Sequence, residues 1–295
     1  MSLRFMNLNP VFQTEVRRNS RSVRISWIIF GGNLLLAVIA AICFFGAGNF
    51  RGYVNARQYL IPIRCHMMMC YALFFMECLL IPGIAGGSIA GERERRTLDI
   101  MLTTRLNPWK IIVGKLEASL SLVFLLAFSA LPSMGMVMIF GGVGYKDLFL
   151  EVIFLVVSGI FMGSIGIFCS ALCQKTNMAT ILSYLITILL VVGTLAALVL
   201  FYFIQVIRME NSGSYYEVTI GPLIYLLLLN PLIPYYGLIT GQLGNGFELQ
   251  EIAGAFGDYG NSWGIQHMIS LGIVAQLLFS LLLLVAAARG LMRRR

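Results

Sequence analysis

Long apolar runs separated by short polar stretches make up most of the chain from residue 25 onward. Six of these runs are long enough to cross the hydrocarbon core of a bilayer, which requires about 20 residues of helix. The runs are continuous and do not alternate between polar and apolar positions, so they predict helices and not the strands of a barrel. The expected spans are residues 25–46, 66–90, 112–140, 149–172, 179–207 and 265–288.

The segment from residue 208 to 264 raises the question of a seventh span. Its uninterrupted apolar core, residues 223–229, is too short to cross a bilayer, and Pro222, Pro231 and Pro234 interrupt the apolar sequence around it. We therefore expect a re-entrant or interfacial segment on the extracellular side, placed before the last span.

The composition supports a membrane protein. Hydrophobic residues make up 59% of the chain and charged residues 12%, against roughly 45–50% and 25% in an average soluble domain. Although 295 residues would by length allow two soluble domains, we expect an all-α membrane protein. Its N-terminal segment, residues 1–24, precedes one six-span domain over residues 25–295.

The distribution of charge predicts the orientation. In the six-span arrangement, most of the 21 Lys and Arg residues lie at the N-terminus, in the loop 91–117 and in the C-terminal tail, which are all on one side. Basic loops remain in the cytoplasm, so both termini are expected to be cytoplasmic in a multi-pass protein of the cell membrane. This bias, with attraction to anionic lipid, accounts for the net charge of +8 without a nucleic-acid partner.

The segment Leu3–Arg24 is predicted to form a helix at the membrane interface. Asn9 is placed to cap it and Pro10 to occupy its first turn. Basic side chains on the helix can reach lipid head groups. The predicted apolar face consists of Leu8, Val11, Phe12 and Val16. The alternative is a frayed basic tail, whereas a cleaved signal peptide is disfavoured because the apolar run that follows is too long.

Few residues suggest catalysis or metal binding. The six cysteines form no CxxC motif or Cys/His ligand set, so we expect them to be small packing residues. His66 and His267 are the only histidines, which excludes an HExxH motif and argues against an intramembrane protease. We therefore expect the chain not to be an enzyme. The sequence GGVGYKD at 141–147 contains the Val-Gly-Tyr of potassium filters, but it lacks the preceding Thr and a pore helix and is better explained as an outer turn.

Glu77 is expected to be the one acidic residue well inside a span. A charge there costs about 2.5–3.5 kcal/mol on insertion scales, so the side chain should face other helices or water, or be protonated. One interpretation is an intramembrane functional residue that handles substrate or protons. The other is a span whose start is shifted, which would leave Glu77 nearer an interface.

A dense charged segment, GERERRTLDIMLTTRLNPWKIIVGK at 91–115, separates the second and third spans. Glu92 can pair with Arg95 and Arg96 at helical spacing. The apolar stripe behind these charges consists of Leu98, Met101, Leu102 and Leu106. We expect an amphipathic helix over residues 91–107, held against the cytoplasmic face and suited to docking a protein. A solvated loop is the alternative.

This segment resembles the cytoplasmic signature of ABC-2 type transporter permeases, the membrane subunits of ATP-binding-cassette exporters. The matching residues are Gly91, Glu92, Arg93, Glu94, Thr97, Leu98, Leu102, Thr103, Gly114 and Lys115. Arg95 and Arg96 replace a pair such as Lys-Gly. The resemblance extends over nearly the whole chain through the interfacial helix, the six spans and the proline-broken segment.

The resemblance implies that a cytoplasmic ABC ATPase subunit moves this segment during transport. The coupling residues would be Gly91, Glu92, Arg93, Glu94, Arg95, Arg96, Thr97, Leu98 and Leu102. The chain contains no GxxxxGK[ST] loop, so ATP and Mg²⁺ are expected on the partner and no cofactor is expected here.

Six spans form half of a transport path, so we also expect a second permease chain, identical or homologous, in the same bilayer. Export is the direction that the resemblance implies, and drugs, peptides, lipids, glycans and ions all remain open as substrates. The alternative from another class is a membrane scaffold or sensor that recruits a cytoplasmic protein without transport. An ion channel is supported only by the Val-Gly-Tyr match.

Overall fold

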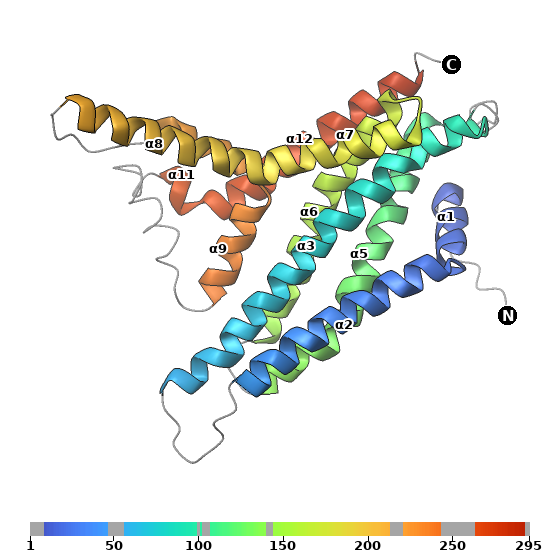
Figure 1. Cartoon of the computed structure of the whole chain (residues 1–295). Helices are drawn as coiled ribbons and strands as arrows, with labels where there is room; N and C mark the ends of the chain where they lie inside the picture. The colour runs from blue at the N-terminus through green and yellow to red at the C-terminus, as the bar shows by residue number, and fades with distance from the viewer. Residues whose placement is uncertain are drawn as a thin grey trace. The chain divides into compact units, whose positions relative to one another are not determined.

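The computed structural model describes residues 9–46, 56–98, 101, 107–139, 144–212, 221–242 and 263–292. All secondary structure in these ranges is helical, which confirms the predicted all-α class. Figure 1 shows and labels the helices. The chain divides into two compact units. Unit 1 comprises Met1–Tyr184 and Ser280–Arg295, and unit 2 comprises Leu185–Phe279.

The described residues contain six helices that are long and apolar enough to cross a membrane. Each overlaps one predicted span, so the described residues contain six helices of spanning length at about the predicted positions. The apolar helical segments are Ile25–Ile42, Ile63–Glu94, Pro108–Gly135, Tyr145–Leu172, Thr176–Asn211 and Met268–Met292.

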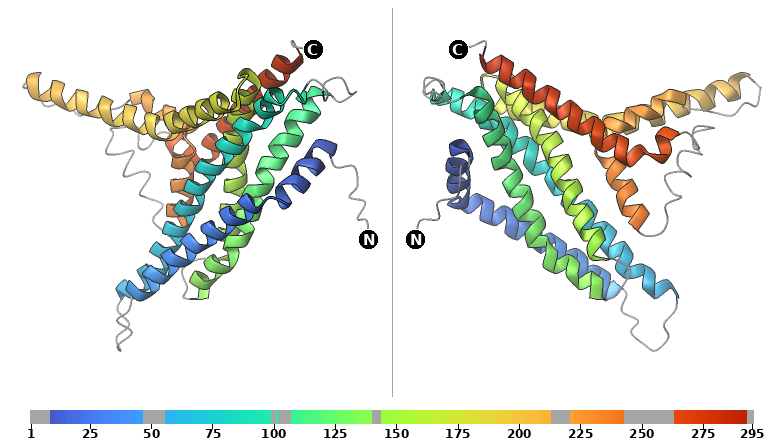
Figure 2. Two further views of the ribbon diagram at one scale, coloured as in Figure 1. Left: turned by 45° about the vertical axis from the view of Figure 1, so that its right-hand side comes forward. Right: turned by 180° about the vertical axis from the view of Figure 1, so that it is seen from behind.

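Unit 1 is a bundle built around three long helices, which pack pairwise against one another. These are α3 (Ala56–Glu94), α5 (Pro108–Ile139) and α6 (Tyr145–Leu172). Helix α2 (Val23–Gly46) packs against α3 and α5, and it crosses them at an angle in both views of Figure 2. The first part of α7 (Thr176–Ile188) and the last part of α12 (Met268–Met292) also belong to this unit.

Small residues allow α3 and α6 to approach closely. A Cβ atom added at Gly166 would lie 2.6 Å from the Cβ of Ala85 and 2.9 Å from the backbone nitrogen of Gly86. Gly159 faces Glu77 in the same way, with 3.0 Å between an added Cβ and the carboxylate. Close backbone approach at small residues is the usual way in which membrane helices gain van der Waals contact, because lipid supplies no hydrophobic driving force between them.

The N-terminal helix α1 (Pro10–Ser20) begins as predicted. Asn9 caps it, with its side-chain oxygen accepting a hydrogen bond from the Val11 nitrogen at 3.2 Å. The helix ends at Ser20, however, and not at Arg24, because the chain turns there and α2 begins at Val23. Residues 1–8 lie outside the described part of the chain. Helix α1 packs on α5 with Val11 buried, and its location at a membrane interface stays a prediction.

Unit 2 contains interrupted helices. A π-helical turn, η1 (Leu189–Gly193), leads into α8 (Thr194–Ser212). A 3₁₀ helix, η2 (Gly221–Leu229), is followed by α9 (Leu232–Gln242) and the short α11 (Trp263–Gln266). With 9 residues in η2 and 11 in α9, neither is long enough to span a bilayer. A re-entrant path for this segment stays a prediction.

Asn230 lies between η2 and α9 and forms side-chain hydrogen bonds there. Its side-chain nitrogen donates to the carbonyl of Val191 at 2.9 Å and to the hydroxyl of Thr194 at 2.8 Å. Its side-chain oxygen accepts from the Leu232 nitrogen at 2.8 Å, which caps the start of α9. One buried amide therefore fixes the broken helix to the π-helical turn.

Candidate functional site

The last turn of α3 contains Gly91–Glu94, which the sequence analysis assigned to a separate amphipathic helix. This helix ends in a Schellman motif: the Arg96 nitrogen bonds the Arg93 carbonyl at 3.0 Å, and the Thr97 nitrogen bonds the Glu92 carbonyl at 2.9 Å. Arg96 takes the left-handed conformation that this motif requires, with φ 58°. The predicted helix over residues 91–107 is therefore wrong at its start, because residues 91–94 belong to α3 and these backbone bonds end that helix.

The apolar stripe predicted after this turn is only partly described. Leu98 is buried and Met101 is half-buried. Leu102 and the rest of residues 102–106 lie outside the described part of the chain, so the role predicted for Leu102 stays a prediction.

Lys115 of α5 connects three helices at this end of unit 1. Its buried Nζ lies 2.6 Å from a carboxylate oxygen of Glu92 on α3 and 3.1 Å from one of Glu15 on α1. Glu92 is thus paired with Lys115 and not with Arg95 and Arg96, the partners expected from helical spacing. The Schellman turn takes Arg96 out of that spacing, and a buried ammonium requires a carboxylate partner.

Arg93 and Glu94 connect the same turn of α3 to α6 and α7. The Arg93 guanidinium donates to the carbonyls of Cys173 and, at 3.1 Å, Ala171. The Glu94 carboxylate accepts from the Thr176 nitrogen at 3.1 Å and from the Thr176 hydroxyl. Helix α7 begins at Thr176, so Glu94 satisfies a free backbone N–H there and its charge is favourable at a helix N-terminus.

A cavity of about 1010 Å³ opens among these residues. Its wall comes from α1, the end of α3, α5 and the start of α7, all within unit 1. The charged side chains that line it are Glu15, Arg18, Glu92, Glu94, Arg95 and Lys115. Arg95 and Thr97 line it and are exposed. Of the predicted coupling residues, Gly91, Glu92, Glu94, Arg95 and Thr97 line this cavity.

Glu77 lies near the middle of α3 and is buried against α6. The Ser158 hydroxyl donates to one carboxylate oxygen at 2.8 Å. Among the described residues the other oxygen has no hydrogen-bond partner. Glu77 is thus an acid inside a helix interface, and its functional role stays a prediction.

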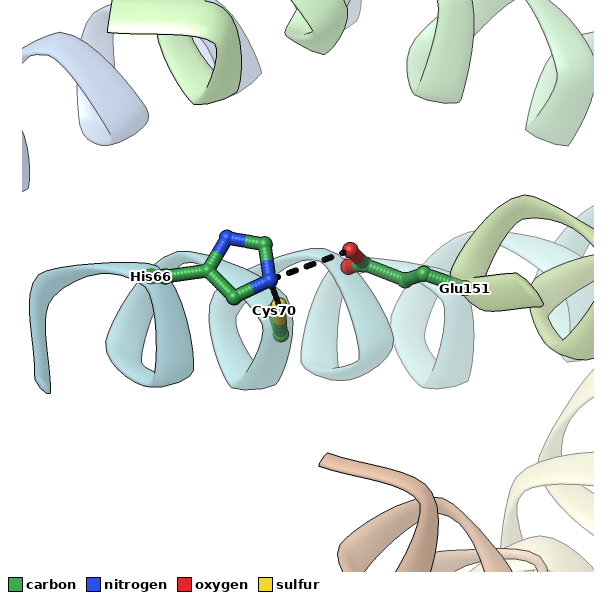
Figure 3. Close-up of side chains that lie close together, drawn as sticks. All are labelled: His66, Cys70 and Glu151. Atoms are coloured by element: carbon green, nitrogen blue, oxygen red, sulfur yellow. Dashed lines mark hydrogen bonds and ion pairs between the residues drawn. The ribbon is translucent and has the colours of Figure 1, made fainter. Parts of the chain in front are cut away.

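A second buried group, which the sequence analysis missed, consists of His66 and Cys70 on α3 and Glu151 on α6 (Figure 3). The expectation that no Cys/His set exists was therefore wrong. Glu151 lies near the start of α6, so the expectation that Glu77 is the one acid well inside a span stays a prediction. The spacing of His66 and Cys70, four residues apart on one helix face, could have revealed the first pair. Glu151 is distant in sequence, and only the packing of α6 on α3 brings it near.

A sequence model of the family described as ABC-2 family transporter protein matches residues 13–292. The chain belongs to this family. The resemblance noted from the charged segment is thereby confirmed over nearly the whole length. As an ABC-2 permease, the chain is a multi-pass membrane component of an ABC transporter and not the ATPase, and the family implies an ABC ATPase subunit as its partner. No individual curated protein matches the chain.

Proposed function

We propose that this ABC-2 permease exports its substrate across the cell membrane, driven by a cytoplasmic ABC ATPase that docks on the charged end of unit 1. The observation that carries the proposal is the position of Lys115, which joins α1, α3 and α5 beside the charged cavity. ATP and Mg²⁺ would be bound by the ATPase. In this arrangement both termini are cytoplasmic.

The contacts at the end of α3 suit it to receive motion. Glu92 and Lys115 tie it to α5, Glu15 extends the network to α1, and Glu94 holds the start of α7. A force on the exposed turn at Arg95 would therefore act on four helices together. A coupling element must move as a rigid unit, so that a movement at its surface reaches the helices behind it.

The proposed cycle uses two permease chains, identical or homologous, and two ATPase subunits. Closure of the ATPases on ATP moves the ends of the two α3 helices and changes access to the path from inward to outward. The switch requires that ATP-bound ATPases have different affinities for the two permease states.

The exposed side chain of Arg95 offers a test that spares the folding contacts. Arg95→Glu reverses a charge at the edge of the cavity, whereas changing Glu92 or Glu94 would also break contacts within the permease. We expect Arg95→Glu to reduce co-purification of the ATPase subunit by at least about tenfold, because like charges in an interface cost several kcal/mol. The matched control is Glu210→Lys, a charge reversal at an exposed position of α8. Equal capture by Arg95→Glu and wild type would contradict the docking site.

A variant of Leu98 distinguishes docking of the ATPase from coupling of its activity to transport. Leu98→Ser removes a buried apolar side chain just after the turn, worth roughly 1.5–3 kcal/mol of burial. We expect ATPase capture to remain while the ratio of substrate moved to ATP hydrolysed falls. A wild-type complex whose ATPase activity no candidate substrate stimulates would instead favour the scaffold function.

The orientation is tested by labelling cysteines from outside intact cells. Glu210→Cys should react with an impermeant maleimide, and Arg95→Cys only after permeabilisation, each compared with the wild-type background. External labelling of Arg95→Cys would overturn the cytoplasmic placement.

A further inference from the structure

We propose that His66, Cys70 and Glu151 bind a divalent transition-metal ion of the zinc type, which links α3 to α6. The three side chains meet inside the bundle, and Figure 3 shows one nitrogen of the imidazole facing both the thiol and the carboxylate. The site is independent of the proposed ATPase docking, because His66 lies roughly 40 Å along α3 from Glu92 at about 1.5 Å per residue.

The distances among the ligand atoms suit a metal ion. Nε2 of His66 lies 3.4 Å from Sγ of Cys70 and 3.8 Å from a carboxylate oxygen of Glu151, and all three ligand atoms lie within 4.8 Å of one another. Tetrahedral Zn²⁺ with its usual bond lengths places neighbouring ligand atoms about 3.3–3.6 Å apart. A small inward movement of Glu151 would therefore complete the three-ligand set.

The kinds of ligand select the metal. Thiolate and imidazole favour Zn²⁺ and neighbouring transition metals over Mg²⁺ and Ca²⁺, which prefer oxygen ligands. Three protein ligands leave the fourth tetrahedral position to water or a small anion. The imidazole can offer the lone pair of Nε2 when its proton is on Nδ1.

The burial of the three side chains favours a bound ion. His66, Cys70 and Glu151 are at most 2% exposed, and a carboxylate and a thiolate in an apolar core require a cation or a proton for compensation. A bound divalent ion would supply that charge and cross-link two helices. The ion is therefore proposed as a resident part of the bundle and not as the transported substrate.

The test uses the full-length permease, purified in detergent and stripped of metal by a chelator. We expect the wild type to bind one Zn²⁺ per chain with a rise in Tm, since a ligand that binds only the folded state stabilises it. Co²⁺ in place of Zn²⁺ should produce a thiolate-to-metal charge-transfer absorption. Absence of Zn²⁺ binding or of this absorption in the folded wild type would overturn the proposal without any variant.

Variants then assign the ligands. Cys70→Ala should abolish the cobalt charge-transfer absorption, and His66→Asn and Glu151→Gln should each weaken Zn²⁺ binding at least about 100-fold, since loss of outer-shell partners alone costs 10–100-fold. Cys169→Ala is the matched control, because Cys169 is also a buried cysteine and lies on α6. It should keep both the absorption and the Zn²⁺-dependent rise in Tm. Equal loss in Cys169→Ala and Cys70→Ala would refute the assignment.

Discussion

The two ends of α3 hold their buried polar groups in different ways. At Glu92, two carboxylates share the ammonium of Lys115 beside a large cavity. Around His66, an imidazole, a thiol and a carboxylate meet in a closed core. The first group pairs carboxylates with an ammonium group. The second contains metal-ligand side chains, which can release a proton when they bind a metal ion. One helix thus combines an end suited to a protein partner with an end suited to an ion.

The largest effect is expected where fixed charges are buried. Lys115→Met would leave Glu15 and Glu92 without their shared cation, and breaking a buried pair in this way costs about 3 kcal/mol or more. Lys110→Met, at an exposed position one turn earlier on α5, should change stability little. Denaturant unfolding of the purified permease measures both. Similar stabilities for the two variants would mean that the Lys115 network does not hold the charged end together.

The next effect tests how closely α3 is packed against α6 between His66 and Glu92. Gly166→Ala would place a methyl group 2.9 Å from the Gly86 backbone, which cannot move aside as a side chain can. We expect a loss of about 2 kcal/mol from overpacking. Gly31→Ala, where nothing lies within 4 Å of the added Cβ, should be neutral or slightly stabilising. Equal behaviour would show that α3 and α6 can separate without cost.

Glu77 lies between the His66 group and Glu92 on α3, and within the described helices its carboxyl group is buried without a charged partner group like either of theirs. Glu77→Leu should stabilise the bundle by about 1 kcal/mol, since it removes a carboxyl group whose burial is only partly compensated. The Ser158 hydroxyl would keep its bond to the Leu155 carbonyl at 3.1 Å. If Glu77 also serves transport, Glu77→Gln should insert normally and alter the transport rate. Unchanged transport in both variants would leave Glu77 a structural residue.

The smallest effect concerns the turn that ends α3. Arg96 has φ 58°, which costs a residue with a Cβ about 1 kcal/mol more than glycine. Arg96→Gly should therefore stabilise the chain by up to that amount while keeping the turn. A thermal shift assay is sensitive enough to detect it. Destabilisation instead would mean that the Arg96 side chain makes a favourable contact.

The spans and the start of α1 could be predicted from the sequence because their causes are local. Apolar length determines a span, and Asn9 beside Pro10 is a complete capping signal. The partner of Glu92 could not be predicted, because local spacing favours Arg95 and Arg96 whereas the structure brings Lys115 from the next helix. The pair of His66 and Cys70 could have been found from its spacing. Its third member, Glu151, depends on how the helices pack.

The π-helical turn at Leu189–Gly193 has a consequence for evolution. Such a turn bonds each residue to the fifth one along instead of the fourth, so it holds one residue more than the same length of α-helix. A relative with a single deletion in this turn would regain a regular helix, and the carbonyl at position 191 would no longer face Asn230 as it does here. The extra residue and the asparagine are therefore expected to be gained or lost together. An alignment of homologues in which either occurs freely without the other would contradict this linkage.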